Sequence, residues 1–453
     1  MISEIFKAYD VRGTVPDQLN EEIARAIGAA FAVFSQSSKI AVARDMRISG
    51  ELLSSAFMDG AMKVGVGIVD LGLGSTDMLY FASGALDMPG AMFTASHNPA
   101  IYNGIKMCLS AARPISSDNG LHDIAELAQS FVDNGIPNAA KAGPYEQKEM
   151  LTKFADHIRS FVDVSNLKPL KVIADTANGM GGLVVPAVFS ALPFELEILF
   201  PELDGNFPNH PADPIQPENL VDLKQRVIST GADIGLAFDG DADRVFLVDD
   251  QGQTISGSTT TALVAKTLAA KHPGSKILYN LICSKAVPEI IAESGAIPIK
   301  TRVGHSFIKT IMGETDALFA GEHSGHYYFR DNFRADSGLI AALVVLEVLS
   351  LSGKPLSQLR IELERYSASG EVNTKVQDVS DVLAFLENAY QGRGKMDHMD
   401  GLTVDMGDWW FNVRPSNTEP LLRLNLEAKS DTEVASKVQE VLAVISKADS
   451  ERK

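Results

Sequence analysis

Hydrophobic positions along the chain form short apolar runs that alternate with longer amphipathic stretches. The short runs, rich in Val and Ile, predict strands, and the stretches whose apolar residues recur every three or four positions predict helices. Alternation of the two predicts βαβ units and mainly parallel sheets. The predicted strands are residues 40–43, 67–71, 91–94, 172–175, 234–238, 245–249, 277–280 and 297–301, and the clearest predicted helices are 21–34, 51–64, 220–230 and 259–271.

The last part of the chain has a different pattern, with predicted helices over 356–366, 381–390 and 433–446 around a strand-rich stretch at 401–426. Turn residues at 134–144 suggest a linker, a hairpin turn is predicted at 249–252, and a break is predicted near 367–370. Usual domain sizes then favour four units. We predict α/β domains over residues 1–145, 146–252 and 253–366, with mixed, mainly parallel sheets, and a smaller C-terminal α+β domain over 367–453.

Composition narrows the class of protein. The chain has 453 residues, 45% of them hydrophobic, which excludes a disordered or fibrous protein. Its 58 acidic and 40 basic side chains give a net charge of −18, which disfavours nucleic acid or an anionic membrane as partner. A small anionic ligand stays compatible with this charge if cations are concentrated locally.

The cellular setting follows from what the sequence lacks. The first residues contain no apolar core of a secretory signal, and the apolar stretch 338–353 is interrupted by Glu347, so it predicts a buried helix. Cys108 and Cys283 do not form a C-x-x-C pair, which argues against a disulfide framework or a thiolate zinc site. We expect a cytoplasmic protein; the sequence does not decide between a monomer and a homodimer.

The first of four polar loops follows the predicted strand at 91–94 and reads Thr-Ala-Ser-His-Asn-Pro over 94–99. Ser96 would lie at the carboxyl edge of a sheet, where open α/β sheets bind their ligands. A capped turn is the alternative, and on this segment alone the favoured one, because Ser, Asn and Pro are ordinary turn residues.

The second loop, Asp-Gly-Asp-Ala-Asp-Arg over 239–244, places three carboxylates at alternate positions. In an extended segment Asp239, Asp241 and Asp243 point to one side and can converge on one cation, and oxygen ligands suit Mg²⁺. An EF-hand is excluded because Asp250 stands where that loop needs Glu. A solvated acidic turn is the weaker alternative, because apolar strands on both sides make uncompensated carboxylates costly.

The third and fourth loops suggest ligand binding less specifically. Gly-Glu-His-Ser-Gly-His over 321–326 offers Glu322 and Ser324 beside glycines, which suits a polyhydroxylated ligand, and does not form the H-E-x-x-H zinc motif. Arg-Pro-Ser-Asn-Thr-Glu-Pro over 414–420 could form a phosphate cradle, and neither a Walker A motif nor a G-x-G-x-x-G is present. An exposed polar turn is equally favoured for each loop in isolation. One such loop on each predicted domain suggests a shared central cleft.

Taken together, the segments TASHNPxxYNGxK, DGDADR, GEHSGH and RPSNTEP resemble the four signature loops of the α-D-phosphohexomutases, in that family's order and spacing. The resemblance spans essentially the whole chain, including YDVRG near the start, and is greatest to the phosphomannomutase/phosphoglucomutase group. Phosphoglucosamine mutases differ at Thr94, at His323 and at the pair His305-Ser306.

The resemblance implies an isomerase that interconverts hexose 6-phosphates and 1-phosphates of mannose, glucose or both, through a phosphorylated Ser96 and a bound hexose 1,6-bisphosphate. It implies Mg²⁺ on Asp239, Asp241, Asp243 and the phosphoserine, and hexose phosphates as the binding partners. Lys106 and His326 are the candidate bases, with Arg12 assisting. The implied substrate-binding residues are Tyr9, His97, Arg302, His305, Glu322, Ser324, Arg414, Ser416, Asn417 and Thr418, and Arg244 matches a further active-site position.

Two alternatives stay open at this point. A phosphoglucosamine mutase is the second enzyme candidate, and a non-catalytic phosphosugar-binding protein on the same fold is the other. Ile282 stands where some bifunctional members have Lys, and the sequence does not decide whether Lys285 or Arg302 replaces it. We expect the cations Arg12, Lys106, Arg244, Arg302 and Arg414 to converge in the cleft.

Overall fold

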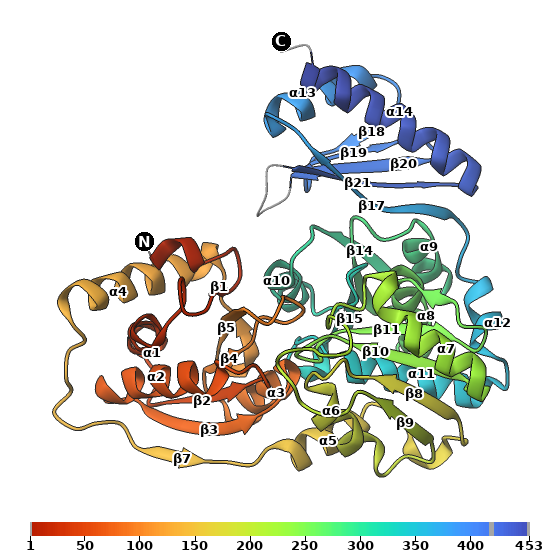
Figure 1. Cartoon of the computed structure of the whole chain (residues 1–453). Helices are drawn as coiled ribbons and strands as arrows, with labels where there is room; N and C mark the ends of the chain where they lie inside the picture. The colour runs from red at the N-terminus through yellow and green to blue at the C-terminus, as the bar shows by residue number, and fades with distance from the viewer. Residues whose placement is uncertain (1, 416–420, 451–453) are drawn as a thin grey trace.

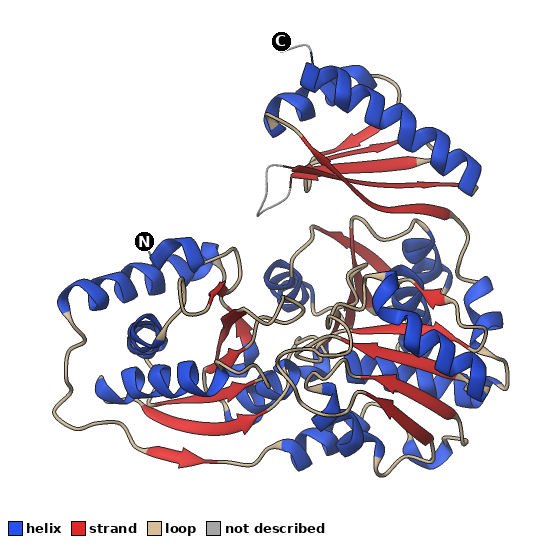
Figure 2. Cartoon of the chain, viewed as in Figure 1, coloured by secondary structure: helices blue, strands red, loops and turns tan. Residues whose placement is uncertain are grey.

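The computed structural model describes residues 2–415 and 421–450, and it folds the chain into four sheets that follow one another along the sequence (Figure 1). We call each sheet with its helices a domain. The first three sheets contain parallel and antiparallel neighbours, and the fourth is antiparallel throughout. The predicted fold class, three α/β domains and a smaller C-terminal domain, is confirmed (Figure 2).

The first sheet has the strand order β1-β5-β4-β2-β3-β7, with β6 paired to β5. Strand β2 is buried on both faces, because Ile40 and Val42 face one helical layer while Ala41 and Ala43 face another. Its strands are β1 (Val11–Thr14), β2 (Lys39–Arg44), β3 (Gly67–Leu73), β4 (Gly90–Phe93), β5 (Tyr102–Leu109), β6 (Arg113–Pro114) and β7 (Tyr145–Gln147), and its helices are α1 (Glu21–Ser35), α2 (Gly50–Lys63), α3 (Thr76–Leu86) and α4 (Leu121–Asn134).

The second sheet has the order β12-β11-β10-β8-β9. Helix α7 ends where the sequence predicts, because Gly231 adopts a left-handed conformation with φ +63. The predicted hairpin turn joins β11 to β12. The elements are β8 (Lys171–Asp175), β9 (Glu195–Leu199), β10 (Ile234–Phe238), β11 (Val245–Asp249), β12 (Thr254–Ile255), α5 (Leu151–Arg159), α6 (Gly181–Phe189) and α7 (Val221–Thr230).

The third sheet has the order β14-β13-β15-β16. Its helix α11 is the apolar stretch predicted to be buried, and the side chain of Ser337 caps it by accepting from the Ile340 N–H. The elements are β13 (Lys276–Asn280), β14 (Ile297–Thr301), β15 (Phe319–Gly321), β16 (Tyr327–Phe329), α8 (Gly257–Lys271), α9 (Ala286–Glu293), α10 (His305–Thr315), α11 (Gly338–Ser352) and α12 (Leu356–Ile361).

The fourth sheet has the order β17-β21-β20-β19-β18, with both helices on one face (Figure 2). Near the predicted break, β17 carries a bulge between Ala368 and Glu371, with Gly370 at φ +66. The helix predicted over 356–366 ends earlier, at Ile361. The elements are β17 (Ser367–Lys375), β18 (Lys395–Asp397), β19 (Leu402–Asp405), β20 (Trp410–Pro415), β21 (Leu421–Ala428), α13 (Val379–Tyr390) and α14 (Asp431–Ser450).

The apolar cores show which domains are packed together. The largest apolar cluster runs without interruption through the first three domains, from Ala41 to Leu363, whereas the fourth domain has a separate core around Phe411 and Tyr390. Among residues 2–415 and 421–450, no helix combines the length and the apolar character needed to cross a membrane.

Candidate active site

Ser96 and Asp239 meet across the boundary between the first and second domains. Each follows the carboxyl end of a buried strand, Ser96 after β4 and Asp239 after β10. The Ser96 hydroxyl donates to Asp239 Oδ2 at 2.8 Å, and both side chains are buried. The first two polar loops therefore form one site, although 143 positions separate these two residues.

The backbone of Ser96 is held in an uncommon conformation. Its φ of +50 lies in the left-handed region, which a residue with a Cβ adopts at a cost when its surroundings fix it there. Its N–H donates to Thr94 Oγ1 at 2.9 Å, and Arg244 Nη2 donates to its hydroxyl at 3.3 Å. The hydroxyl thus faces an arginine and a carboxylate at once.

Asp239, Asp241 and Asp243 form an acidic triad whose ligand oxygens lie within 4.8 Å of one another, and all three side chains are buried. Asp241 Oδ1 and Asp243 Oδ1 are buried without a hydrogen-bond partner. Buried, unpartnered carboxylate oxygens on an all-oxygen donor set fit a hard divalent cation. The arrangement fits a metal ion, as the spacing predicts.

Charge in the triad is unevenly balanced. Burial and repulsion from the other two carboxylates raise the pKa of Asp239 well above its ordinary range. Burial by itself raises the pKa of Asp241, but the Lys106 ammonium and the Thr76 hydroxyl, both bonded to Asp241 Oδ2, lower it below that range. A cation bound here would relieve the repulsion that Asp239 feels.

Lys106, on β5, reaches across from the first domain to the triad. Its ammonium donates to Asp241 Oδ2 and Asp243 Oδ2, both at 2.7 Å. Burial by itself lowers the pKa of Lys106, but the two carboxylates raise it well above the ordinary value. Lys106 therefore carries its charge and ties the first domain to the second.

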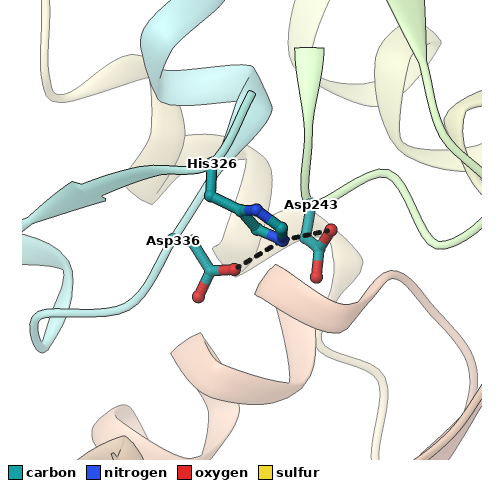
Figure 3. Close-up of side chains that lie close together, drawn as sticks. All are labelled: Asp243, His326 and Asp336. Atoms are coloured by element: carbon teal, nitrogen blue, oxygen red, sulfur yellow. Dashed lines mark ion pairs between the residues drawn. The ribbon is translucent and has the colours of Figure 1, made fainter. Parts of the chain in front are cut away.

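His326 lies between two buried carboxylates (Figure 3). Its Nε2 is 3.9 Å from Asp243 Oδ1 and 4.0 Å from Asp336 Oδ2, and its Nδ1 is 3.1 Å from Ser324 Oγ. Burial and the nearby Arg244 lower the pKa of His326 to about 4, although the carboxylates act in the opposite direction. The imidazole is therefore neutral at pH 7 and able to accept a proton.

Asp336 belongs to a buried ion pair that links the third domain to the first. Its Oδ1 lies 2.8 Å from Lys309 Nζ, and that ammonium lies 3.8 Å from the centre of the Tyr80 ring on α3. Burial by itself raises the pKa of Asp336, but Lys309 lowers it below the ordinary range. This pair fixes one of the two carboxylates beside His326.

The third loop turns Glu322 inward. Glu322 Oε2 accepts from the Tyr328 hydroxyl at 2.7 Å, and Oε1 accepts from Asn280 Nδ2 and the Gly304 N–H, each at 3.3 Å. Burial raises the pKa of Glu322. A carboxylate oxygen has two lone pairs, so Oε2 keeps capacity for one more donor, such as a sugar hydroxyl.

Tyr9, in the first domain, touches the third. The rings of Tyr9 and His305 lie 4.9 Å apart, and a Cβ on Gly304 would come within 2.4 Å of the Tyr9 hydroxyl. Only glycine allows this approach, and Gly304 also has a φ of +129. Burial and the Lys309 charge lower the pKa of His305 well below its ordinary value.

Arg12 and His97 lie on the Ser96 side of the site. Arg12 Nη1 donates to Asn98 Oδ1 at 2.7 Å and its Nη2 pairs with Asp10 at 2.6 Å. His97 Nδ1 accepts from Arg244 Nη2 at 2.7 Å, and burial together with the two arginines lowers the pKa of His97 well below its ordinary value. His97 is therefore neutral.

The remaining predicted cations are dispersed. Arg302 is exposed, with its guanidinium 3.8 Å from the centre of the Phe307 ring, and Arg414 Nη2 bonds Glu371 in the fourth domain at 3.0 Å. Lys285 is directed to the fourth domain, where it donates to Asp405 at 2.7 Å and to a main-chain carbonyl. Lys285 is paired with Asp405, whereas no carboxylate pairs with Arg302 among the described contacts.

Part of the fourth loop lies outside the described residues. This applies to Ser416, Asn417 and Thr418, so the structure gives no position for their side chains.

The structure adds four residues that the sequence did not single out: Arg47, Thr76, Lys309 and Asp336. A signal existed for Arg47, because a polar segment follows the strand β2 just as polar loops follow β4 and β10. For the other three, the sequence around them is ordinary. Thr76 reaches the site across the boundary between the first two domains, whereas Lys309 and Asp336 meet beside His326 within the third domain.

The chain matches known proteins along most of its length. Family models of the phosphoglucomutase/phosphomannomutase α/β/α domains I, II and III match residues 3–131, 152–252 and 256–366, and the model of the C-terminal domain matches 371–444. A phosphomannomutase of Escherichia coli K12 is 40% identical over 436 residues, covering 94% of this chain and 95% of that protein.

Two further relatives agree. A Xanthomonas campestris protein described as phosphohexose mutases is 40% identical over 430 residues, with 94% of this chain and 95% of that protein covered. The crystal structure of a phosphoglucomutase/phosphomannomutase family protein from Burkholderia thailandensis superposes with a TM-score of 0.90 at 33% identity, covering 98% of both chains. The chain therefore belongs to the phosphoglucomutase/phosphomannomutase family and is a phosphohexomutase.

Proposed function

We propose that this enzyme interconverts the 6-phosphates and 1-phosphates of mannose, glucose or both, with Ser96 as the residue that carries the phosphoryl group. The observation that supports this proposal best is the Ser96 hydroxyl, which lies 2.8 Å from Asp239 Oδ2 and 3.3 Å from an arginine nitrogen in a buried site. Such surroundings can both ligate a cation and neutralise a phosphate.

The proposed reaction has two transfers. In the first, the bond between phosphorus and Ser96 Oγ breaks, a bond to the free hydroxyl oxygen of the hexose monophosphate forms, and the hydroxyl proton passes to a base. The resulting hexose 1,6-bisphosphate then reorients within the site, so that its other phosphoryl group faces Ser96. In the second transfer its other phosphoryl group returns to Ser96 Oγ, and the newly freed sugar oxygen regains a proton.

Asp239, Asp241 and Asp243 would hold Mg²⁺ together with an oxygen of the phosphoserine, and the ion would neutralise charge on the group in transfer. The chemistry of the donor set supports this, because hard oxygen ligands suit Mg²⁺. The structural fit supports a divalent cation, and the choice of Mg²⁺ is our proposal.

For the base we favour His326 over Lys106. His326 is neutral and lies 3.9 Å from Asp243, hence close to where the phosphoryl group would be bound. Lys106 holds its proton between two carboxylates, so we assign it an electrostatic role beside Arg12. Geometry and protonation state both support this order.

Recognition of the sugar is assigned to the third and fourth loops. Glu322 and Ser324 would accept and donate hydrogen bonds to hydroxyls at C3 and C4, and Arg414 with Ser416, Asn417 and Thr418 would bind the phosphate that is not reacting. Tyr9, His97, Arg244, Arg302 and His305 would complete the pocket. Contacts that avoid C2 would leave the site indifferent to the difference between glucose and mannose.

The test is the Ser96→Ala variant assayed with mannose 1-phosphate and glucose 1-phosphate, each with catalytic hexose 1,6-bisphosphate. We expect loss of turnover with both sugars and no gain of one phosphoryl group in the intact mass. Ser110→Ala is the matched control, because its hydroxyl bonds Asp87 at an exposed site. Mutase activity in Ser96→Ala near that of wild type would overturn the phosphoserine scheme.

A panel that includes glucosamine 6-phosphate separates the alternatives. Preference for the amino sugar would identify a phosphoglucosamine mutase, and tight binding of hexose phosphates without turnover would identify a phosphosugar-binding protein. We expect neither outcome, because a relative described as a phosphomannomutase shares 40% identity with this chain.

A further inference from the structure

The side chain of Arg47 runs beneath the loop that carries Ser96. Its Nη2 donates to the carbonyl oxygens of Ser96 at 2.8 Å and Asn98 at 2.7 Å. Its Nη1 donates to the carbonyl oxygens of Pro99 and Tyr102, both at 2.9 Å. All four Nη hydrogens of one guanidinium therefore bond main-chain carbonyls of the Ser96 loop and of Tyr102, where β5 begins.

The guanidinium is enclosed on its other sides. Arg47 Nε lies 3.3 Å from Asp45 Oδ2, and both side chains are fully buried. The ring of Phe207, from the second domain, covers the guanidinium with its centre 5.3 Å from Cζ. A Cβ on Gly205 would come within 2.7 Å of the Arg47 Cα, so the second domain packs directly on this residue. Arg47 is thus confined to one position.

The contact to Ser96 bears on the orientation of its hydroxyl. Ser96 has a φ of +50, its carbonyl oxygen points to Arg47, and its hydroxyl points to Asp239. A left-handed serine persists only where its surroundings over-determine it. Because the carbonyl and the hydroxyl are attached to the same backbone unit, fixing the first restricts the direction of the second.

We propose that Arg47 is a positioning residue for phosphoryl transfer, which orients Ser96 by clamping the carbonyl oxygens of its loop. This inference rests on the proposed function, in which Ser96 carries the phosphoryl group. A lysine cannot replace the arginine, because its three donors radiate from one nitrogen and cannot span four carbonyls. Since none of these contacts of Arg47, within the described part of the chain, involves the third loop, its loss should affect the transfer step and leave substrate affinity unchanged.

The experiment compares Arg47→Lys with wild type in turnover of mannose 1-phosphate at saturating glucose 1,6-bisphosphate. Misplacement of a reacting group by about 1 Å costs about 100-fold, so we expect kcat to fall by about tenfold to 100-fold. We expect KM to stay at its wild-type value. Because an unfolded fraction would also lower apparent kcat at unchanged KM, kcat is calculated per folded molecule, with the folded fraction measured by circular dichroism.

Arg159→Lys is the matched control. Arg159 also donates through Nη1 to two carbonyl oxygens, those of Ala187 and Val188 at 2.9 and 3.0 Å, and it pairs with Asp156. Its partners lie on α5 and α6, away from Ser96. We expect wild-type kcat and KM in this variant.

Hydrogen exchange provides a second readout. In Arg47→Lys, amides over 94–104 should exchange faster, with protection elsewhere in the first sheet unchanged. If Arg47→Lys does not fold, Arg47→Gln, which keeps two N–H donors, takes its place in both measurements. Wild-type kcat in a folded Arg47 variant would overturn the inference, as would a rise in KM at unchanged kcat.

Ser96→Ala separates the two proposals. If Ser96→Ala is inactive and Arg47→Lys turns over as wild type does, only the positioning role fails. If Ser96→Ala is active, the proposed function fails and the positioning role fails with it.

Discussion

The buried pair of Lys309 and Asp336 gives a quantitative test of how the third domain is held beside the site. In Lys309→Met the carboxylate of Asp336, 4% exposed, loses an ammonium at 2.8 Å that is itself 2% exposed. Removing one partner of a buried pair costs about 3–5 kcal/mol, because the other charge is left uncompensated. The lost contact of the ammonium with the Tyr80 ring, at 3.8 Å, acts in the same direction.

The sign of the pH dependence follows from the pKa of Asp336. In wild type Lys309 holds this pKa below its unfolded value of about 3.9, so the pair contributes fully above that value and is lost as pH falls through the folded pKa. Without Lys309, we expect burial, the largest effect on this carboxyl, to outweigh the lowering by His326, His305 and Lys106 and to raise the folded pKa above the unfolded one. The variant then keeps its stability at low pH and loses it as pH rises. The free energy of unfolding of Lys309→Met should therefore be closer to that of wild type at pH 5 than at pH 8.

Choice of the assay matters, because Trp409 and Trp410 both belong to the fourth domain. Tryptophan fluorescence would follow the wrong part of the molecule, so unfolding is measured by far-ultraviolet circular dichroism and calorimetry.

The double variant Lys309→Met/Asp336→Asn should lose less than the sum of the two single variants, since neither charge of this pair is left without its partner. Lys429→Met, which breaks an exposed pair with Asp408, is the control and should melt as wild type does. Additive losses, or a loss equal at pH 5 and pH 8, would refute the reasoning.

Three further predictions concern the site and its boundaries. Thr76→Val removes the hydroxyl that donates to the middle carboxylate of the acidic triad at 2.6 Å, so Mg²⁺ affinity in isothermal titration should fall by about 10–100-fold; unchanged affinity would exclude this role. Burial raises the pKa of Asp77 to about 7, so the melting temperature should fall as pH rises through 7, and Asp77→Asn should flatten that slope; an identical slope would contradict the assignment. Gly240→Ala places a Cβ 2.5 Å from the Ser96 carbonyl oxygen and should abolish turnover. The control Gly50→Ala, whose nearest contact is at 3.4 Å, should keep its activity. Full activity of Gly240→Ala would show that the Ser96 loop can move to accommodate the methyl group.

The sequence predicted best the elements whose residues face apolar neighbours on both sides. Strand β10 begins and ends at the predicted residues, 234–238, because every position is buried. Strand β5 was missed, since Asn103 and Gly104 resemble a turn and Lys106 is polar. It is nevertheless a central strand, because β1 and β4 pair with it on either side and Lys106 has carboxylate partners 135 and 137 positions away.

Site residues were predictable where chemistry was concentrated in one segment. The acidic triad is one such case, because three carboxylates at alternate positions need no tertiary information to suggest a cation. Thr76 and Asp336 are the opposite case, because each has a single polar group in an ordinary context. Thr76 gains its role from the packing of the first domain on the second, and Asp336 gains its role from the folding of the third domain, which brings it to Lys309 and His326. Of the cations expected in the cleft, Lys106 and Arg244 contact the triad, whereas the Arg302 side chain is exposed beside Phe307.

The shared apolar cluster of the first three domains has a consequence for unfolding. Its buried members, from Ala41 to Leu363, come from all three domains. They join the first domain to the other two, although the first domain also has a core of its own around Phe31 and Phe57, so we expect the three domains to unfold as a single cooperative unit. The fourth domain has its own core and meets the third partly through ion pairs, such as those of Lys285 with Asp405 and Lys300 with Asp397. A calorimetric scan should accordingly resolve two endotherms, and added salt should shift the smaller one alone.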